Sequence, residues 1–226
     1  MKTVSILDLL KSGAHFGHKK SKRYPKMEKY IFGVKDGAHL INLEETIVCL
    51  ESAVNFIKKT VGNGNKILFI GTKRQAKSIV KEAAEKCSMP YVISRWLGGT
   101  FTNFNNIYKL PKKLTTLEEE KAAGVYDKNT KKEKLIIDRE IIKLKEMVEG
   151  IREMDKLPGA IFVVDIKDDK TAIEEARKKK IPIIAITDTN TNPELVDFPI
   201  PANDDSVNTL KLISSVISEA VLEGKK

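Results

Sequence analysis

Residues 160–188 read AIFVVDIKDDKTAIEEARKKKIPIIAITD, and this stretch decides the fold. It begins with a short apolar segment, continues through a charged segment with apolar residues at helical spacing, and returns to a second apolar segment. Short apolar runs bounded by polar residues are typical of strands buried on both faces, and a helix between two such strands makes them parallel. The stretch therefore predicts a β-α-β unit of an α/β protein.

The same alternation extends in both directions along the chain. Upstream, KILFIG at 66–71 predicts a strand, and Thr72 and Gln75 form a T-x-x-Q capping box that predicts a helix directly after it. PYVIS at 90–94 predicts a short strand, and FPIPANDD at 198–205 predicts a strand followed by a long helix. We expect one Rossmann-like parallel sheet flanked by helices.

The first part of the chain predicts smaller elements. MKTVSILDLLKSG is typical of an amphipathic helix and not of a signal peptide, because Asp8 interrupts the apolar stretch. Further on, YIFGV and AHLINL flank the turn KDG and predict a β-hairpin. Asn42 and Glu45 form a capping signal for a helix over 43–59.

Residues 103–156 differ in composition, since positions 112–156 hold twelve basic and eleven acidic residues. Apolar residues step by four and three along two segments, namely Leu110, Leu114 and Leu117 in the first and Ile137, Ile141, Leu144, Val148 and Ile151 in the second. Such stepping predicts a coiled coil. We expect a protruding helical hairpin at 103–156, inserted into an α/β domain made of 1–102 and 157–226. The alternative is an ordinary pair of helices that belongs to the main domain.

The charge distribution indicates a polyanionic partner. The 226 residues include 40 Lys and Arg against 31 Asp and Glu, a net charge of +9. Residues 1–35 hold nine basic and two acidic side chains, and residues 66–95 hold seven and two. Clustering of this kind favours a phosphate-binding surface. The apolar runs are too short for a membrane span, and the lone Cys49 and Cys87 fit a reduced cytosolic compartment.

The strongest basic segment is HFGHKKSKRYPKMEKY at 15–30. Its candidate phosphate-binding residues are Lys19, Lys20, Lys22, Arg23 and Lys26, with Phe16, Tyr24 and Tyr30 between them. Cations bind phosphates and exposed aromatic rings stack on bases, which predicts RNA binding. The alternative is a lysine-rich surface loop whose aromatic residues pack on the core.

Two further basic sites are predicted nearer the sheet. Lys73 and Arg74 stand at the expected start of a helix, where free backbone N–H groups attract an anion. Arg95 begins RWLGGTFTN, in which Trp96 is more commonly a buried anchor than an RNA contact. The turn GTKRQAK matches neither G-x-G-x-x-G nor a P-loop, so a nucleotide- or cofactor-dependent α/β enzyme, the main rival interpretation, is disfavoured.

Several motifs together carry a resemblance to a known family. In chain order they are HFGHKKSKRYPKMEKYIFG, HLINLEET, ILFIGTKRQA, RWLGGTFTN, LPGAIFVVD, IPIIAITDTNTNP and IPANDDSVNTL. This combination resembles the bacterial small-subunit ribosomal protein S2 family. The resemblance implies a flavodoxin-like sheet with an inserted coiled-coil hairpin, a cytoplasmic location in the small ribosomal subunit, and no catalytic activity. It also implies contacts with small-subunit ribosomal RNA and neighbouring proteins, support for docking of ribosomal protein S1, and no required cofactor, small-molecule substrate or membrane.

A divalent metal site is the last expectation. Asp188 follows one predicted strand and Asp204 and Asp205 follow the next, so these carboxylates should meet at the carboxyl edge of the sheet. The resemblance places the segment of His18 against the same domain. Oxygen ligands alone favour magnesium, and an added imidazole favours zinc. The alternative is that Asp188 forms an Asx-turn and that Asp204 or Asp205 caps the C-terminal helix, without a metal.

Overall fold

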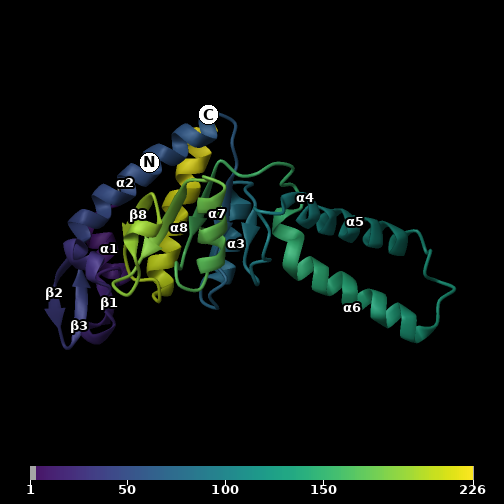
Figure 1. Cartoon of the computed structure of the whole chain (residues 1–226), viewed down its shortest axis with the longest axis horizontal. Coiled ribbons are helices and arrows are strands. Elements are labelled where there is room, and N and C mark those ends of the chain that lie inside the picture. The colour runs from purple at the N-terminus through teal and green to yellow at the C-terminus, as the bar shows by residue number, and fades with distance from the viewer. Residues whose placement is uncertain (1–3, 226) are drawn as a thin grey trace.

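The computed structural model describes residues 4–225 and contains a five-stranded sheet in which every strand is parallel to its neighbours. Its strands are β4 (Ile67–Ile70), β5 (Tyr91–Val92), β6 (Ala160–Val163), β7 (Ile183–Thr187) and β8 (Phe198–Pro201). They lie in the order β5-β4-β6-β7-β8, which is the flavodoxin-like order 2-1-3-4-5 (Figure 1). The α/β fold expected from the sequence is confirmed.

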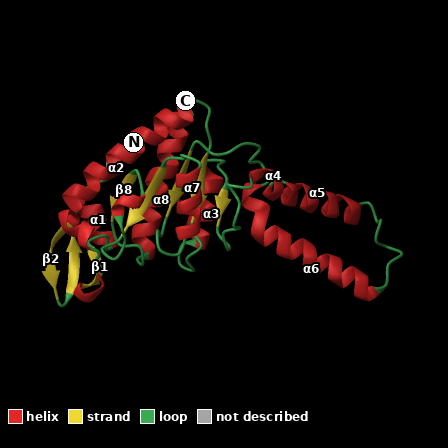
Figure 2. Cartoon of the chain, viewed as in Figure 1, coloured by secondary structure: helices red, strands yellow, loops and turns green. Residues whose placement is uncertain are grey.

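Helices cover both faces of the sheet (Figure 2). They are α1 (Ile6–Ser12), α2 (Leu43–Gly62), α3 (Lys77–Lys86), α7 (Lys170–Lys178) and α8 (Val207–Gly224), with a single turn η4 (Pro193–Leu195) between β7 and β8. None of the helices within residues 4–225 carries an apolar stretch long enough to cross a bilayer.

Alternate side chains of the central strands β4, β6 and β7 enter two separate hydrophobic clusters. Phe69 and Phe162 point to one face, where they pack with residues of α2, α3 and α8. Leu68 and Ile161, one position earlier, point to the other face and pack with residues of α7 and of the helical insertion. Because both faces are covered, β4 and β6 are apolar at every position, as the sequence indicated.

The N-terminal part forms a second, antiparallel sheet in the order β1-β3-β2. The predicted hairpin is present as β2 (Ile31–Lys35) and β3 (Ala38–Ile41), and Asn42 caps α2 through the backbone N–H of Glu44. The basic segment before it contains a further strand, β1 (Phe16–Lys19), and two 3-10 turns, η1 (Lys20–Lys22) and η2 (Pro25–Tyr30). The segment is therefore an ordered strand with two turns.

The capping box predicted at Thr72 and Gln75 is wrong. Helix α3 begins at Lys77 with Ala76 at the N-cap, and no side chain caps it. The Thr72 hydroxyl instead donates to the Asp169 carboxylate at 2.9 Å, and residues 73–76 form a turn. The local T-x-x-Q pattern failed because a carboxylate nearly a hundred residues away competes for the same hydroxyl.

Residues 104–151 form a helical hairpin that projects from the body of the molecule (Figure 1). It consists of α4 (Phe104–Ile107), α5 (Lys109–Ala122), α6 (Lys131–Val148) and the turn η3 (Glu149–Ile151). Leu114, Leu144 and Val148 are buried at its base, in the cluster shared with α7 and the sheet, whereas Ile141 is only partly buried. The base thus belongs to the main core. Coiled-coil packing and the boundaries at 103 and 156 stay predictions.

Candidate functional site

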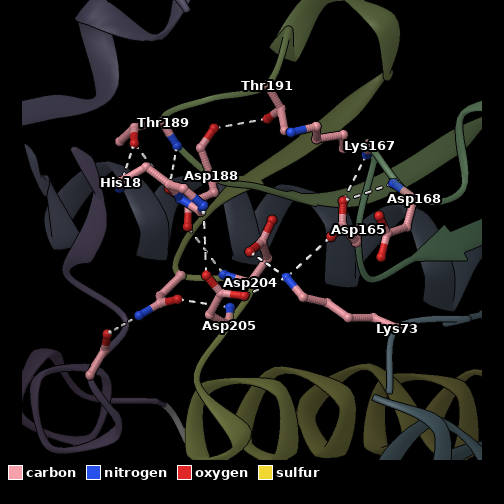
Figure 3. Close-up of polar contacts among 12 residues, drawn as sticks. His18, Lys73, Asp165, Lys167, Asp168, Asp188, Thr189, Thr191, Asp204 and Asp205 are labelled. Carbon is pink, nitrogen blue, oxygen red and sulfur yellow. Dashed lines mark hydrogen bonds and ion pairs between the residues drawn. The ribbon is translucent and has the colours of Figure 1, made fainter. Parts of the chain in front are cut away.

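Four strands deliver charged side chains to one edge of the sheet (Figure 3). Lys73 follows β4, Asp165 follows β6, Asp188 follows β7 and Asp204 follows β8, so the parallel topology brings them together at the carboxyl ends. In the flavodoxin-like order this edge is where ligands usually bind. We call these residues, with Asp205 and His18, the acidic cluster.

Lys73 lies at the centre of the acidic cluster. Its Nζ is 2.7 Å from Asp205 Oδ1, 2.9 Å from Asp204 Oδ1 and 3.2 Å from Asp165 Oδ2. Burial opposes the charged amine, but the hydrogen bonds to Asp205 and Asp204 outweigh it and raise the pKa of Lys73. The prediction that Lys73 offers its amine to a phosphate at a helix start is therefore wrong, because three carboxylates already bind it.

His18 ties the basic segment to the acidic cluster. Its Nδ1 is 3.2 Å from Asp188 Oδ1 and its Nε2 is 3.6 Å from Asp205 Oδ2. The hydrogen bond to Asp188 raises the pKa of His18 against the effect of burial. The expectation that His18 and these carboxylates converge is thus met in the geometry. Asp165, which the sequence analysis missed, also lies there. It could have been found in the same way as Asp188, because it too follows an apolar strand.

The carboxylates outnumber the cations in the acidic cluster. Asp165, Asp188 and Asp204 are each less than 5% exposed, and only Lys73 and a protonated His18 oppose their charge among the described residues of the cluster. Burial, with the charges of Asp165 and Asp188, raises the pKa of Asp204 to about 7, whereas the Lys73 hydrogen bond lowers the pKa of Asp205. One ligand atom from each of His18, Asp188 and Asp204 lies within 4.8 Å of the others, as a metal site requires.

The structure does not show the metal-free alternative in the form that the sequence suggested. Asp188 Oδ1 accepts the backbone N–H of Thr189, the next residue, at 2.5 Å, whereas an Asx-turn is closed by the N–H two residues on. The N-cap of α8 is Ser206, whose hydroxyl accepts from the Thr209 N–H, and neither Asp204 nor Asp205 caps that helix. Capping therefore does not explain why two aspartates stand there.

The turn after β7 holds the basic segment in place. The Thr189 hydroxyl accepts the His18 N–H at 2.9 Å, and the Thr189 carbonyl accepts the Tyr24 N–H at 2.8 Å. A Cβ at Gly17 would lie 2.6 Å from Thr189 Cγ2, so the close approach requires glycine at that position. Strand β1 is thereby fixed against the large sheet.

The candidate RNA-binding side chains of this segment are exposed, but they are not equivalent. Arg23 pairs with Glu28 at 3.4 Å and Lys26 pairs with Glu194. Within residues 4–225, Lys19, Lys20 and Lys22 have no ion-pair partner. Of the interleaved aromatic residues, Phe16 is 51% exposed, whereas Tyr30 is buried and therefore cannot stack on a base.

Arg74 and Arg95 are both exposed, on the turn before α3 and on the loop after β5. Trp96 beside Arg95 is buried, as expected, and its indole N–H donates to Glu175 at 3.2 Å. Glu175 of α7 also accepts the backbone N–H groups of Gly99, Phe101 and Thr102. This loop-organising carboxylate was missed because in sequence it looks like one of two adjacent helical glutamates.

Comparison with known proteins finds relatives that cover nearly the whole chain. The family model described as ribosomal protein S2 matches residues 9–224. A protein named small ribosomal subunit protein uS2 from Roseiflexus castenholzii is 48% identical over 222 residues, which cover 98% of this chain and 84% of the relative. Proteins of the same name from Salinibacter ruber and Dehalococcoides mccartyi are 48% and 44% identical, covering 98% and 100% of this chain and 69% and 92% of theirs.

Proposed function

The chain belongs to the ribosomal protein S2 family, and from this membership we propose that it binds the phosphate backbone of small-subunit ribosomal RNA through its N-terminal basic segment. The protein is a structural component of the small ribosomal subunit, and the rival interpretation as a nucleotide- or cofactor-dependent enzyme is set aside. A folded RNA presents shape and phosphate charge, which suits an array of exposed cations.

The observation that carries this proposal is the state of Lys19, Lys20 and Lys22. They are exposed and unpaired among residues 4–225, on a segment that Thr189 and His18 fix to the large sheet. A fixed backbone lowers the entropy cost of placing the three amines on successive phosphates. Arg23, Lys26, Arg74 and Arg95 surround this core set as additional contacts.

The test is the salt dependence of binding between the full chain and purified small-subunit ribosomal RNA. Each lost phosphate contact should reduce the slope of log K against log salt by about 0.9 on duplex and about 0.7 on single-stranded RNA, so the triple variant Lys19→Ala, Lys20→Ala, Lys22→Ala should lose about 2–3. The matched control removes three ion-paired lysines, Lys81, Lys86 and Lys170. Equal slopes in both triple variants would refute the proposal.

A second part of the proposed function concerns protein partners. The family resemblance implies neighbouring small-subunit proteins and ribosomal protein S1. An exposed apolar surface on the edge strand β2 supports such a contact, since Phe32 is 79% exposed and Val34 is 50% exposed. The variant Phe32→Ser should weaken S1 retention on isolated subunits without changing RNA affinity; unchanged retention would count against this surface.

The third part is a divalent cation at the acidic cluster, held by His18, Asp188 and Asp204 with Asp205 beside them. The imidazole in the ligand set favours zinc over magnesium. Metal analysis of purified protein should find about one equivalent, lost in Asp188→Asn and His18→Ala and kept in the exposed control Asp168→Asn. If the purified wild type contains no stoichiometric metal, this part is refuted, and the positive charge opposing the carboxylates comes from Lys73.

A further inference from the structure

The C-terminal end of α7 carries the longest uninterrupted basic run in the chain. Arg177, Lys178, Lys179 and Lys180 are four consecutive basic residues, whereas the basic segment at 15–30 has at most two in succession. All four side chains are exposed. Within residues 4–225 none of them has an ion-pair or side-chain hydrogen-bond partner. We call these four residues the α7 basic corner.

The backbone of this corner is a Schellman motif with an unusual residue at its critical position. The Ile181 N–H donates to the Ala176 carbonyl at 2.9 Å, and the Lys180 N–H donates to the Arg177 carbonyl at 3.1 Å. Lys180 has φ of 56°, in the left-handed region. Glycine is the residue that adopts this conformation without a penalty from a Cβ.

Other helices of the same protein follow the usual rule. Helices α1, α2 and α5 end with the same pair of backbone hydrogen bonds, and each has glycine in the left-handed position, namely Gly13, Gly64 and Gly124. Helix α3 is the other exception among the helices described, with Ser88 at φ of 49°. Of these described helices, only α7 has a long cationic side chain at the left-handed position, where glycine would cause less backbone strain.

A helix C-terminus attracts cations, so one or two lysines in the last turn have a purely structural explanation. That explanation does not extend to Lys180, because it lies beyond the helix and adds strain that a glycine avoids. Two acidic side chains nearby have other partners: Glu174, one turn earlier on α7, pairs with Lys170 at 3.7 Å, and Asp197 accepts the Ile183 N–H at 2.8 Å. The corner therefore presents four cations that no described residue pairs with.

We propose that the α7 basic corner, Arg177 to Lys180, is a second binding surface for the phosphate backbone of ribosomal RNA. It rests on the proposed RNA-binding function but lies elsewhere on the molecule. Helix α7 runs back along the sheet from its N-cap Asp169, which contacts Thr72 at the carboxyl edge, to Lys178, five residues before β7 begins at Ile183 (Figure 1). The corner thus lies at the amino edge, whereas β1 docks at the carboxyl edge, and the two surfaces contact separate stretches of RNA.

The decisive variant is Lys180→Gly, because it should relieve backbone strain and so maintain or raise stability, but should weaken RNA binding. Relief of the left-handed Cβ should leave the melting temperature unchanged or raise it by up to about 4 °C. Loss of one phosphate contact should reduce the salt slope of binding to purified small-subunit RNA by about 0.9 on duplex and about 0.7 on single-stranded RNA. Ser88→Gly is the matched control, since it relieves the same strain in the same motif without a charge change and should leave the slope unaltered.

Charge and conformation are separated by Lys180→Arg, which should keep the slope of the wild type. Replacing Lys178 and Lys179 by Ala together with Lys180→Gly should reduce the slope by about 2–3. An unchanged salt slope in this triple variant overturns the proposal. If substitution of Lys19, Lys20 and Lys22 still reduces the salt slope by about 2–3, the main RNA-binding proposal survives. Unchanged RNA binding with poor incorporation into subunits would also overturn it and indicate an acidic protein partner.

Discussion

Replacement of Glu175 by glutamine tests whether one buried carboxylate organises the loop at 95–103. Glu175 is 6% exposed and accepts five hydrogen bonds from that loop. Its Oε1 accepts from Trp96 Nε1 at 3.2 Å and from Gly99 N at 2.7 Å, and its Oε2 accepts from Phe101 N at 2.9 Å, from Thr102 N at 3.1 Å and from Thr102 Oγ1 at 3.2 Å. Glutamine keeps the shape of the side chain but offers an acceptor on one side only.

The cost follows from this count. The amide nitrogen of the substituted side chain would replace the oxygen that serves fewer donors, so the Trp96 and Gly99 N–H groups would lose their acceptor. Two hydrogen bonds to a charged group contribute about 3–6 kcal/mol. Part of this loss is offset, because the neutral glutamine does not carry the desolvation cost of a buried carboxylate. We therefore expect Glu175→Gln to lower the free energy of unfolding by about 2–4 kcal/mol at neutral pH.

The pH dependence of this loss has a definite sign. Burial opposes the charged form, but the backbone hydrogen bonds of Gly99, Phe101 and Thr102 outweigh it and hold the pKa of Glu175 below its ordinary value of 4.5. The stabilisation is therefore present above pH 4.5 and is lost as pH falls through the folded-state pKa. The difference between wild type and variant should shrink accordingly in acid.

Urea unfolding followed by tryptophan fluorescence measures this directly, because Trp96 is the only tryptophan. The control is Glu174→Gln. The Glu174 side chain is 56% exposed and, among the described residues, pairs only with Lys170, at 3.7 Å. The control should therefore lower the free energy of unfolding by less than about 0.5 kcal/mol. Equal losses in the two variants would refute the assignment of Glu175 as the residue that organises the loop.

Three further outcomes are expected. Gly17→Ala should cost about 1–3 kcal/mol in urea unfolding and weaken RNA binding, since its Cβ would meet Thr189 at 2.6 Å; an unchanged midpoint would contradict the docking of β1 described above. Burial raises the pKa of Asp169 from 3.8 to about 6. The free energy of unfolding of the wild type should therefore fall by up to about 3 kcal/mol as the pH rises from about 4 to about 7. A pH series of unfolding curves should show a smaller fall in the variant Asp169→Asn. Replacing residues 121–138 by a glycine linker should preserve cooperative unfolding, because the buried Leu114 at the base is retained, whereas Leu114→Ala should cost about 2–5 kcal/mol.

The sequence by itself determined the class of fold, the family and the places where charge concentrates. Strand β6 and helix α7 were predictable because the periodicity of apolar residues reflects burial along a single element. Asp188 and Asp204 could be placed together in advance, since parallel strands end at one edge whatever their order. The N-terminal hairpin followed equally from its turn residues.

Only the tertiary structure decided which charged groups meet. Lys73 was indistinguishable in sequence from a free phosphate ligand, yet Asp165, Asp204 and Asp205 surround its amine. Glu175 and Glu174 are adjacent and chemically alike, but the one faces the loop at 95–103 and the other faces solvent. Electrostatic and hydrogen-bond energies depend on distances between residues far apart in the chain, and those distances exist only once the sheet, its helices and β1 have packed together.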